Sequence, residues 1–232
     1  MIPWIDPEDS QPFPDINTAL KEPNGLLAAG GSLQPERLLM AYRAGIFPWF
    51  DEDQPILWWS PDPRMALKPS EIHISKSLKK FIKKNLLHCT YDLAFPQVIS
   101  ACAEPRPDQP DTWITQQMQQ AYITLHQRGF AHSIEVWKDE HLVGGLYGVS
   151  IGHVFFGESM FSRYDNASKV GFVFLCEQLQ AWGYQLIDAQ VKSEHLESLG
   201  ATLLPRHVFS KLLKQYCAEQ PAANAWQIQN HA

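Results

Sequence analysis

The sequence predicts an α+β protein in which a small N-terminal domain precedes a larger domain with a mixed, largely antiparallel sheet. The first 60 residues are rich in proline, glycine and aromatic side chains, which is typical of short elements joined by turns. Between residues 131 and 156, apolar or alternating segments are separated by short turns, which predicts antiparallel strands. The Pro61-Asp62-Pro63 segment interrupts any regular element, so we expect domains at 1–62 and 63–232.

In the first half of the chain, helices are predicted from apolar residues at helical spacing and from proline and glycine signals. The clearest helix, 34–43, has Pro35 in its first turn and Gly45 just past its end. Further helices are expected over residues 75–85, 95–103 and 115–128. Residues 104–111 contain three prolines and are expected to form a loop.

The second half of the chain is expected to complete the larger sheet. Strands 131–138, 141–150 and 153–156 are predicted to form an antiparallel meander. A helix over 166–182 then leads into strand 184–191, a connection long enough to return the chain to the same sheet. Two shorter helices, near 194–199 and 206–220, end the chain.

Composition excludes several classes of protein. The four cysteines, at 89, 102, 176 and 217, form no CxxC pair, so neither a zinc site nor a disulfide framework is expected. No apolar run approaches the roughly 20 residues that span a bilayer, and the N-terminus lacks a signal-peptide pattern. We therefore expect a cytoplasmic protein without a metal or a membrane partner. The net charge of −6 argues against general affinity for nucleic acid, so any such binding requires a local basic patch.

Three polar residues at the ends of two predicted strands suggest a reaction centre. Glu158 follows the apolar segment His153–Phe156, and Asp188 and Gln190 end the segment that begins at Leu186. Regular alternation would put Asp188 and Gln190 on one face of their strand. The three groups could hold an amine and move its proton. Spacing alone equally allows a helix-capping residue and two strand ends bonded to backbone; their shared position at strand ends favours function.

An apolar set accompanies these polar residues. Its members are Leu146, Phe155, Met160, Phe172 and Leu175. Apolar residues on strands and helices usually fill a core, so the pattern alone indicates packing. Met160 is the exception because it is expected in a polar loop, and methionine adapts well to an apolar ligand.

Five lysines without acidic neighbours form a basic helix surface in a chain of negative net charge. They are Lys76, Lys79, Lys80, Lys83 and Lys84. A solvated face is the ordinary interpretation, but the absence of compensating acids favours phosphate binding. Trp49 and Trp113 are expected in loops, where they either anchor the loop or stack on a base. Together the lysines and tryptophans indicate binding of single-stranded nucleic acid at a 3′ end.

The order of elements resembles the N-acetyltransferase (GNAT) sheet, with one difference. Acetyl-CoA enzymes place a glycine-rich turn before the central helix, where backbone N–H groups hold the pyrophosphate. The corresponding segment here, 159–166, contains no glycine. The glycines at 144–148 lie inside a strand, where a bulge or close packing is the better interpretation.

Long motifs along the chain resemble the leucyl/phenylalanyl-tRNA–protein transferase family, over about residues 22–206. The motifs are Glu22-Pro23-Asn24-Gly25-Leu26-Leu27, Met40-Ala41-Tyr42-Arg43-Ala44-Gly45-Ile46-Phe47-Pro48-Trp49-Phe50, Trp58-Trp59-Ser60-Pro61-Asp62-Pro63-Arg64, His132-Ser133-Ile134-Glu135-Val136-Trp137, Gly157-Glu158-Ser159-Met160-Phe161-Ser162 and Asn166-Ala167-Ser168-Lys169. The resemblance implies a monomeric bacterial enzyme with a GNAT-like domain that needs no cofactor, metal or ATP. It implies transfer of leucine, phenylalanine or methionine from aminoacyl-tRNA to a protein N-terminal Arg or Lys, which marks that protein for N-end rule degradation.

The resemblance also implies roles for the residues singled out above. Asp188 and Gln190 match a pair that acts on the attacking amine, and Glu158 matches an acidic residue of the same centre that binds the basic N-terminal residue. The apolar set matches the pocket for the aminoacyl side chain, Trp49 and Trp113 match residues that hold the terminal adenosine, and the five lysines match a tRNA-binding helix. Two alternatives stay open: a CoA-dependent N-acyltransferase of the same fold, and a non-catalytic RNA-binding module.

Overall fold

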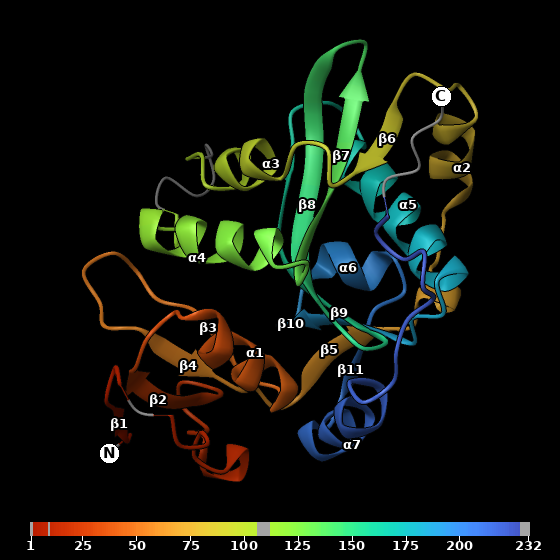
Figure 1. Ribbon diagram of the computed structural model, residues 1–232. Coiled ribbons are helices and arrows are strands. Elements are labelled where there is room, and N and C mark those ends of the chain that lie inside the picture. The colour runs from red at the N-terminus through yellow and green to blue at the C-terminus, as the bar shows by residue number, and fades with distance from the viewer. Residues whose placement is uncertain (1, 9, 106–111, 228–232) are drawn as a thin grey trace.

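The computed structural model describes residues 2–8, 10–105 and 112–227, and its strands form two sheets (Figure 1). The smaller sheet contains β1 (Trp4–Ile5), β2 (Leu26–Gly30), β4 (Leu57–Trp59) and β3 (Phe47–Pro48), in that order. Helix α1 (Pro35–Arg43) lies between β2 and β3 in the chain and begins with the predicted proline. The predicted loop at 104–111 lies mostly outside the described residues.

The larger sheet has seven strands. In spatial order they are β11 (Thr202–Leu204), β5 (Arg64–Leu67), β10 (Leu186–Gln190), β9 (Val154–Ser162), β8 (His141–Ile151), β7 (Ala131–Lys138) and β6 (His88–Tyr91). Every neighbouring pair is antiparallel except β9 and β10, which run parallel. The predicted mixed, largely antiparallel sheet is therefore confirmed.

Helices cover both faces of the larger sheet (Figure 1). Helices α3 (Phe95–Cys102) and α4 (Gln116–Gln127) pack on one face, and α5 (Ala167–Ala181) packs on the other. Helix α2 (Lys76–Ile82) lies against α5. Helices α6 (Glu194–Ser198) and α7 (Arg206–Tyr216) follow β10, and two short 3₁₀ helices cover Ile16–Thr18 and Pro69–Glu71. Among the described residues, no helix is long and apolar enough to cross a membrane.

Several element predictions were wrong, each for a local reason. β9 does not end at Phe156 but runs to Ser162, because it stays paired with β8 beyond the parallel pairing with β10. Met160 therefore lies in a strand, opposite Leu146, and not in a polar loop. The lysine helix is shorter than expected, since α2 ends at Ile82. Strands β1–β6 and β11 were not predicted, because two to five residues are too few to show a period.

The position of the domain boundary stays a prediction. β4 belongs to the smaller sheet and β5, which begins at Arg64, belongs to the larger one, so the chain passes between the sheets at residues 60–63. The predicted close packing around the strand glycines is confirmed at Gly148. A Cβ atom there would lie 2.2 Å from the Phe156 carbonyl oxygen and 2.6 Å from Phe155 Cζ. The glycine lets the Phe155 ring lie against the backbone of β8.

We predict that Gly148→Ala destabilises the protein by about 2 kcal/mol or more, because a backbone atom must move to admit the methyl group. Gly157→Ala is the matched control. Gly157 lies opposite Gly148 on β9, and the nearest atom to its added Cβ is 3.5 Å away, which is an ordinary contact. Urea denaturation of both variants measures the difference. Equal stability of the two would contradict this packing.

Candidate functional site

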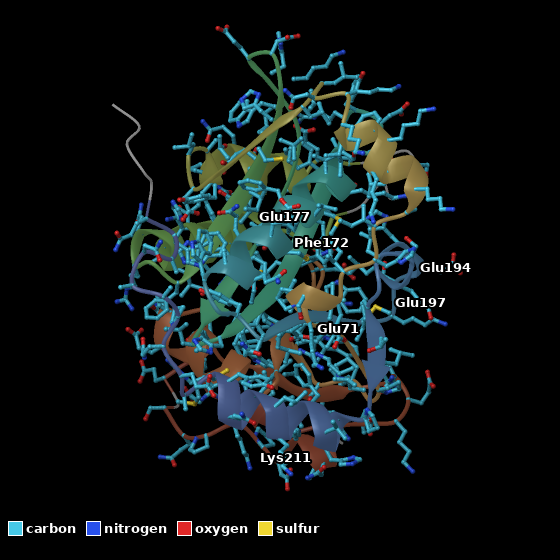
Figure 2. The ribbon with its side chains drawn as sticks, turned by 90° about the vertical axis from the view of Figure 1, so that its right-hand side faces the viewer. Glu71, Phe172, Glu177, Glu194, Glu197 and Lys211 are labelled. Atoms are coloured by element: carbon cyan, nitrogen blue, oxygen red, sulfur yellow. The ribbon has the colours of Figure 1, made fainter. Side chains whose placement is uncertain are left out.

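A cavity of about 610 Å³ lies between β8, β9, β10, α5 and α6. This volume is typical of a site for a small ligand. All five predicted apolar residues line it, and so do the three predicted polar residues (Figure 2 marks Phe172 on α5). The structure therefore brings Leu146, Phe155, Met160, Phe172 and Leu175 together with Glu158, Asp188 and Gln190.

The cavity opens where two parallel strands diverge. β9 and β10 pair only at Val154–Phe156 with Leu186–Asp188. Past this point β9 continues along β8, while β10 remains paired with β5. In the pairing of β8 with β9, Gly148 lies opposite Gly157 and the preceding residue, Tyr147, lies opposite Ser159. Glu158 therefore has no partner on β8 and is the extra residue of a bulge. A bulge turns a side chain out of the regular alternation, and here it supplies the carboxylate at the divergence.

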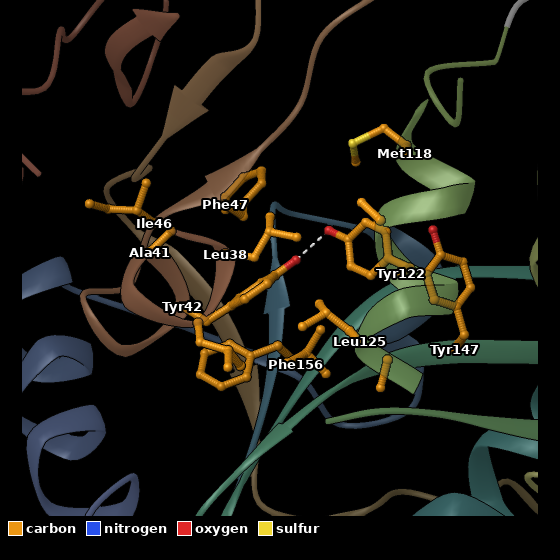
Figure 3. Packing of buried hydrophobic residues seen from close by; sticks show 14 of the residues in the cluster. Leu38, Ala41, Tyr42, Ile46, Phe47, Met118, Tyr122, Leu125, Tyr147 and Phe156 are labelled. Atoms are coloured by element: carbon orange, nitrogen blue, oxygen red, sulfur yellow. Dashed lines mark hydrogen bonds between the residues drawn. The ribbon is translucent and has the colours of Figure 1, made fainter. Parts of the chain in front are cut away.

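Glu158 is held by side chains from three other elements. The Tyr42 hydroxyl of α1 donates a hydrogen bond to Oε1 and the Tyr122 hydroxyl of α4 donates to Oε2, each at 2.8 Å. Gln190 Nε2 donates to Oε1, also at 2.8 Å. The two tyrosine hydroxyls also lie within hydrogen-bonding distance of each other (Figure 3), and since each has one hydrogen, this contact replaces one of the two bonds to Glu158 unless Glu158 is protonated and donates. The small domain therefore contributes directly to the site through Tyr42.

Burial sets the protonation of this cluster. Burial raises the pKa of Glu158 to about 8, although the hydrogen bonds from Tyr42 and Tyr122 oppose the change, and the negative charge of Asp188 raises it further. Burial, followed by the charge of Glu158, raises the pKa of Tyr42 and of Tyr122 well above the usual range. Both tyrosines therefore stay protonated, and Glu158 titrates near neutral pH.

Asp188 is completely buried, and both of its carboxylate oxygens accept hydrogen bonds. Arg64 Nε and Nη2 donate to its two oxygens at 2.8 and 2.7 Å, and the Gln190 backbone N–H donates to Oδ1 at 2.9 Å. The predicted alternation is interrupted by a bulge between Asp188 and Gln190, and Gln190 has a φ of +61°. Asp188 thus fixes the backbone from which Gln190 reaches Glu158.

The predicted RNA-binding residues lie apart from this cavity. All five lysines of the basic helix surface are exposed. Trp49 is 43% exposed and packs against Trp59, whose indole N–H donates to the Trp49 carbonyl at 2.7 Å. Neither Trp49 nor Trp113 lines the cavity between β9 and β10. Their chain neighbours Phe50 and Thr115 line a second cavity of about 430 Å³.

Sequence reasoning missed the residues that hold the polar centre. Tyr42 and Tyr122 look like ordinary members of the apolar faces of two helices, and Arg64 had no assigned role. One signal was available for Arg64, because it opens the apolar segment Arg64–Leu67, and a charge inside such a segment needs a buried partner. No sequence signal connects Tyr42 with Glu158, which lies 116 residues away.

A separate group of possible metal ligands is already hydrogen-bonded. Ligand atoms of Asp92, His126 and His132 lie within 4.8 Å of one another. His132 Nδ1 bonds to Asp92 Oδ2 at 2.7 Å, and His126 Nδ1 bonds to the Ala131 carbonyl at 2.8 Å. Because the nitrogens that face the centre of the group are used in this way, we assign it a structural role.

Comparisons of the sequence with known proteins agree on one family. The model of the leucyl/phenylalanyl-tRNA protein transferase family matches residues 66–214, and that of its N-terminal domain matches 31–62. A leucyl/phenylalanyl-tRNA–protein transferase from Cellvibrio japonicus is 56% identical, covering 95% of this chain and 93% of its own. A second leucyl/phenylalanyl-tRNA–protein transferase, from Pseudomonas fluorescens (strain SBW25), is 55% identical, and the match covers 97% of this chain and 99% of the relative. Among solved structures, a GCN5-related N-acetyltransferase from Kribbella flavida has 11% identity and a TM-score of 0.33, covering 72% of this chain and 59% of its own.

The two family models together span most of the chain, and the relatives match it over nearly their full length. The chain belongs to the leucyl/phenylalanyl-tRNA–protein transferase family.

Proposed function

We propose that the protein transfers leucine, phenylalanine or methionine from aminoacyl-tRNA to the α-amino group of a protein that begins with Arg or Lys. The observation that carries this proposal is an apolar cavity that also contains Glu158 and Gln190. In this proposal the protein acts as a monomer in the cytoplasm, and the transferred residue marks its target for N-end rule degradation.

The donor side of the reaction follows from the lining of the cavity. An apolar pocket of this kind accepts side chains that are unbranched at Cβ and discriminates against Ile and Val by shape. The connection from β9 to α5, residues 163–166, contains no glycine, which disfavours a bound CoA pyrophosphate. An aminoacyl ester is already activated, so positioning supplies much of the barrier reduction, roughly 7–11 kcal/mol in favourable cases.

The charged groups that line the cavity favour a cationic acceptor. The described lining residues include no Lys or Arg, and their carboxylates are Glu158 and Asp188. Asp188 is neutralised by Arg64, which leaves Glu158 as the carboxyl group that becomes the negative charge at the cavity when a bound cation favours its ionised form. A cationic acceptor compensates this charge, in agreement with an N-terminal Arg or Lys.

The proton of the attacking amine moves to Glu158 in this mechanism. Asp188 is buried and paired, so it acts through Gln190 instead of contacting the amine. Gln190 Nε2 is bonded to Glu158, and no described residue donates to Gln190 Oε1, which can accept an amine N–H. Gln190 orients the amine, and ionised Glu158 takes the proton directly from it, since the pKa of Glu158, about 8, is close to that of an α-amine. The leaving ribose hydroxyl gains its proton from the neighbouring hydroxyl, and the proton that Glu158 took from the amine restores that neighbour.

The RNA part of the donor is assigned to surfaces outside the cavity. The basic helix surface is exposed and lies beside α5, which lines the cavity. In this proposal the lysines bind tRNA phosphates, and Trp49 and Trp113 hold the terminal adenosine by stacking.

A transfer assay without ATP or added metal tests the proposed function. Purified protein should transfer labelled leucine and phenylalanine from their tRNAs to an Arg-starting peptide, and isoleucine at least about tenfold more slowly. A Glu-starting peptide is the acceptor control. Gln190→Ala should lower kcat by about 10²-fold. Absence of transfer by the wild type, or binding of acetyl-CoA in a titration, would reject the proposal.

The raised pKa of Glu158 makes a prediction for stability. Between about pH 4.5 and pH 8 the folded protein keeps this proton while the unfolded chain releases it, so the free energy of unfolding falls as pH rises. We expect the wild type to lose a few kcal/mol more than Glu158→Gln over this range. Denaturation of both proteins at about pH 5 and pH 9 gives the difference. Parallel pH profiles would show that Glu158 has an ordinary pKa.

The basic helix surface predicts the salt dependence of tRNA binding. Replacing Lys79, Lys80, Lys83 and Lys84 by Gln should weaken binding and flatten its salt slope by about 0.7–0.9 for each phosphate that the variant no longer neutralises. Lys211→Gln with Lys214→Gln is the matched control, since Figure 2 shows Lys211 at the opposite end of the molecule from α2. Filter binding at several salt concentrations measures the affinity of each variant for tRNA and the salt dependence of that affinity. An unchanged slope in the first variant would place the tRNA elsewhere.

A further inference from the structure

The chain beyond α7 returns across the larger domain and is fastened at several points. His153 Nε2 hydrogen-bonds to the Gln220 carbonyl at 2.7 Å, and the Ala222 N–H donates to the Trp182 carbonyl at 3.1 Å. The Tyr91 hydroxyl donates to the Gln227 carbonyl at 2.7 Å. We call residues 217–227 the C-terminal tail. Its bonds to three different parts of the larger domain define its course.

Trp226 is the main side-chain anchor of the C-terminal tail. Its ring stacks on His132, with centroids 4.1 Å apart and planes at 8°, and its indole N–H donates to the Tyr184 hydroxyl at 2.9 Å. It also packs against Trp182 at 4.8 Å. Trp226 has a φ of +59°, which is rare for a bulky residue. Such a conformation persists only where the surrounding contacts hold it, and it is often found at functional positions.

Trp226 also stacks on Phe155, with centroids 5.8 Å apart and planes at 27°. Phe155 is completely buried and lines the cavity between β9 and β10. On β8, the missing side chain of Gly148 makes room for the same ring, 2.6 Å from where a Cβ would lie. Phe155 is therefore placed by Gly148 and by Trp226.

Trp226 lines another cavity of about 500 Å³, together with His132 and Tyr184. Phe155 lines the 610 Å³ cavity, and the two rings are in contact. The Phe155–Trp226 stack is thus a partition between two cavities. An aromatic pair of this kind contributes specific geometry in addition to buried area.

We propose that Trp226 is a positioning residue for the aminoacyl pocket: by holding Phe155 in place, the C-terminal tail sets the depth of the pocket and so the choice between leucyl and larger apolar groups. The inference rests on the proposed function, because it treats Phe155 as a wall for the donor side chain. Trp226 itself lines only the far side of the partition and takes no part in the chemistry.

The central experiment compares Trp226→Ala with the wild type, using Leu-tRNA and Phe-tRNA as donors and an Arg-starting peptide. Without the indole, Phe155 is free to move back and the pocket deepens. The leucyl group then packs less closely against the pocket wall, while the larger phenylalanyl group fills the new space. We expect KM for Leu-tRNA to rise about tenfold with little change in kcat, and KM for Phe-tRNA to change by less than about twofold.

Two further variants separate positioning from general stability. Trp226→Phe keeps a ring against Phe155 and should restore the wild-type preference, whereas Trp226→Leu keeps an apolar side chain without a ring and should not. His153→Ala removes a fastening of the tail at Gln220 while keeping both rings of the Phe155–Trp226 stack, and should leave the ratio of the two KM values unchanged. These variants keep the test valid if Trp226→Ala does not fold.

The outcomes are distinguishable from those of the proposed function. If the wild type transfers neither amino acid, the proposed function fails and this inference fails with it. If the wild type is active but Trp226→Ala and Trp226→Leu lower transfer of leucine and phenylalanine in equal proportion, Trp226 is a stability residue only. A shifted ratio in His153→Ala as large as in Trp226→Ala would also overturn the proposal.

Discussion

The buried ion pair between Arg64 and Asp188 is the interaction on which the polar centre depends. It joins β5 to β10 at the place where the chain leaves the smaller sheet. The Arg64 guanidinium also lies over the rings of Phe47 in the smaller sheet and Phe209 in α7, at 4.7 and 5.0 Å. One side chain thereby connects both sheets and the last helix to the same carboxylate.

A buried ion pair is a constraint more than a source of stability. Desolvation of two charges offsets much of their attraction, whereas loss of one partner typically costs about 3–5 kcal/mol because the other is left unpaired. The ion pair contributes by fixing the positions of neighbouring groups. Asp188 accepts the backbone N–H of Gln190, and this bond stabilises the left-handed conformation from which the Gln190 amide reaches Glu158. The polar centre is thus built outward from an ion pair that is almost completely buried.

The sequence predicted the long elements well and the connections between them less well. Helices α1, α3 and α4 and strands β7 and β8 lie within a residue or two of their expected bounds, because each has a clear period and clear end signals. The end of β9 was wrong, because its pairing with β8 depends on a partner strand and not on its own composition. The apolar set was assigned to a pocket only through family resemblance, because its members come from β8, β9 and α5 and by pattern alone look like core residues.

The polar centre, too, was predicted only in part from the sequence. Glu158, Asp188 and Gln190 were chosen as residues at predicted strand ends; this was wrong for Glu158, which lies inside β9. Neither bulge was predictable, because a bulge appears only in the register of two strands. Arg64, Tyr42 and Tyr122 were missed because their roles arise from contacts between distant segments. The tail was expected to continue as a helix to residue 220, and its return across the larger domain gave no sequence signal.

The cluster of Tyr42, Tyr122 and Glu158 draws its members from the small domain, from a helix on one face of the larger sheet and from the sheet itself. No one of these segments completes the cluster alone, so it forms only after the two sheets have docked. The basic helix surface, by contrast, is local in the chain and does not require that docking. A chain whose sheets have not yet docked therefore has its lysines in place before the polar centre exists.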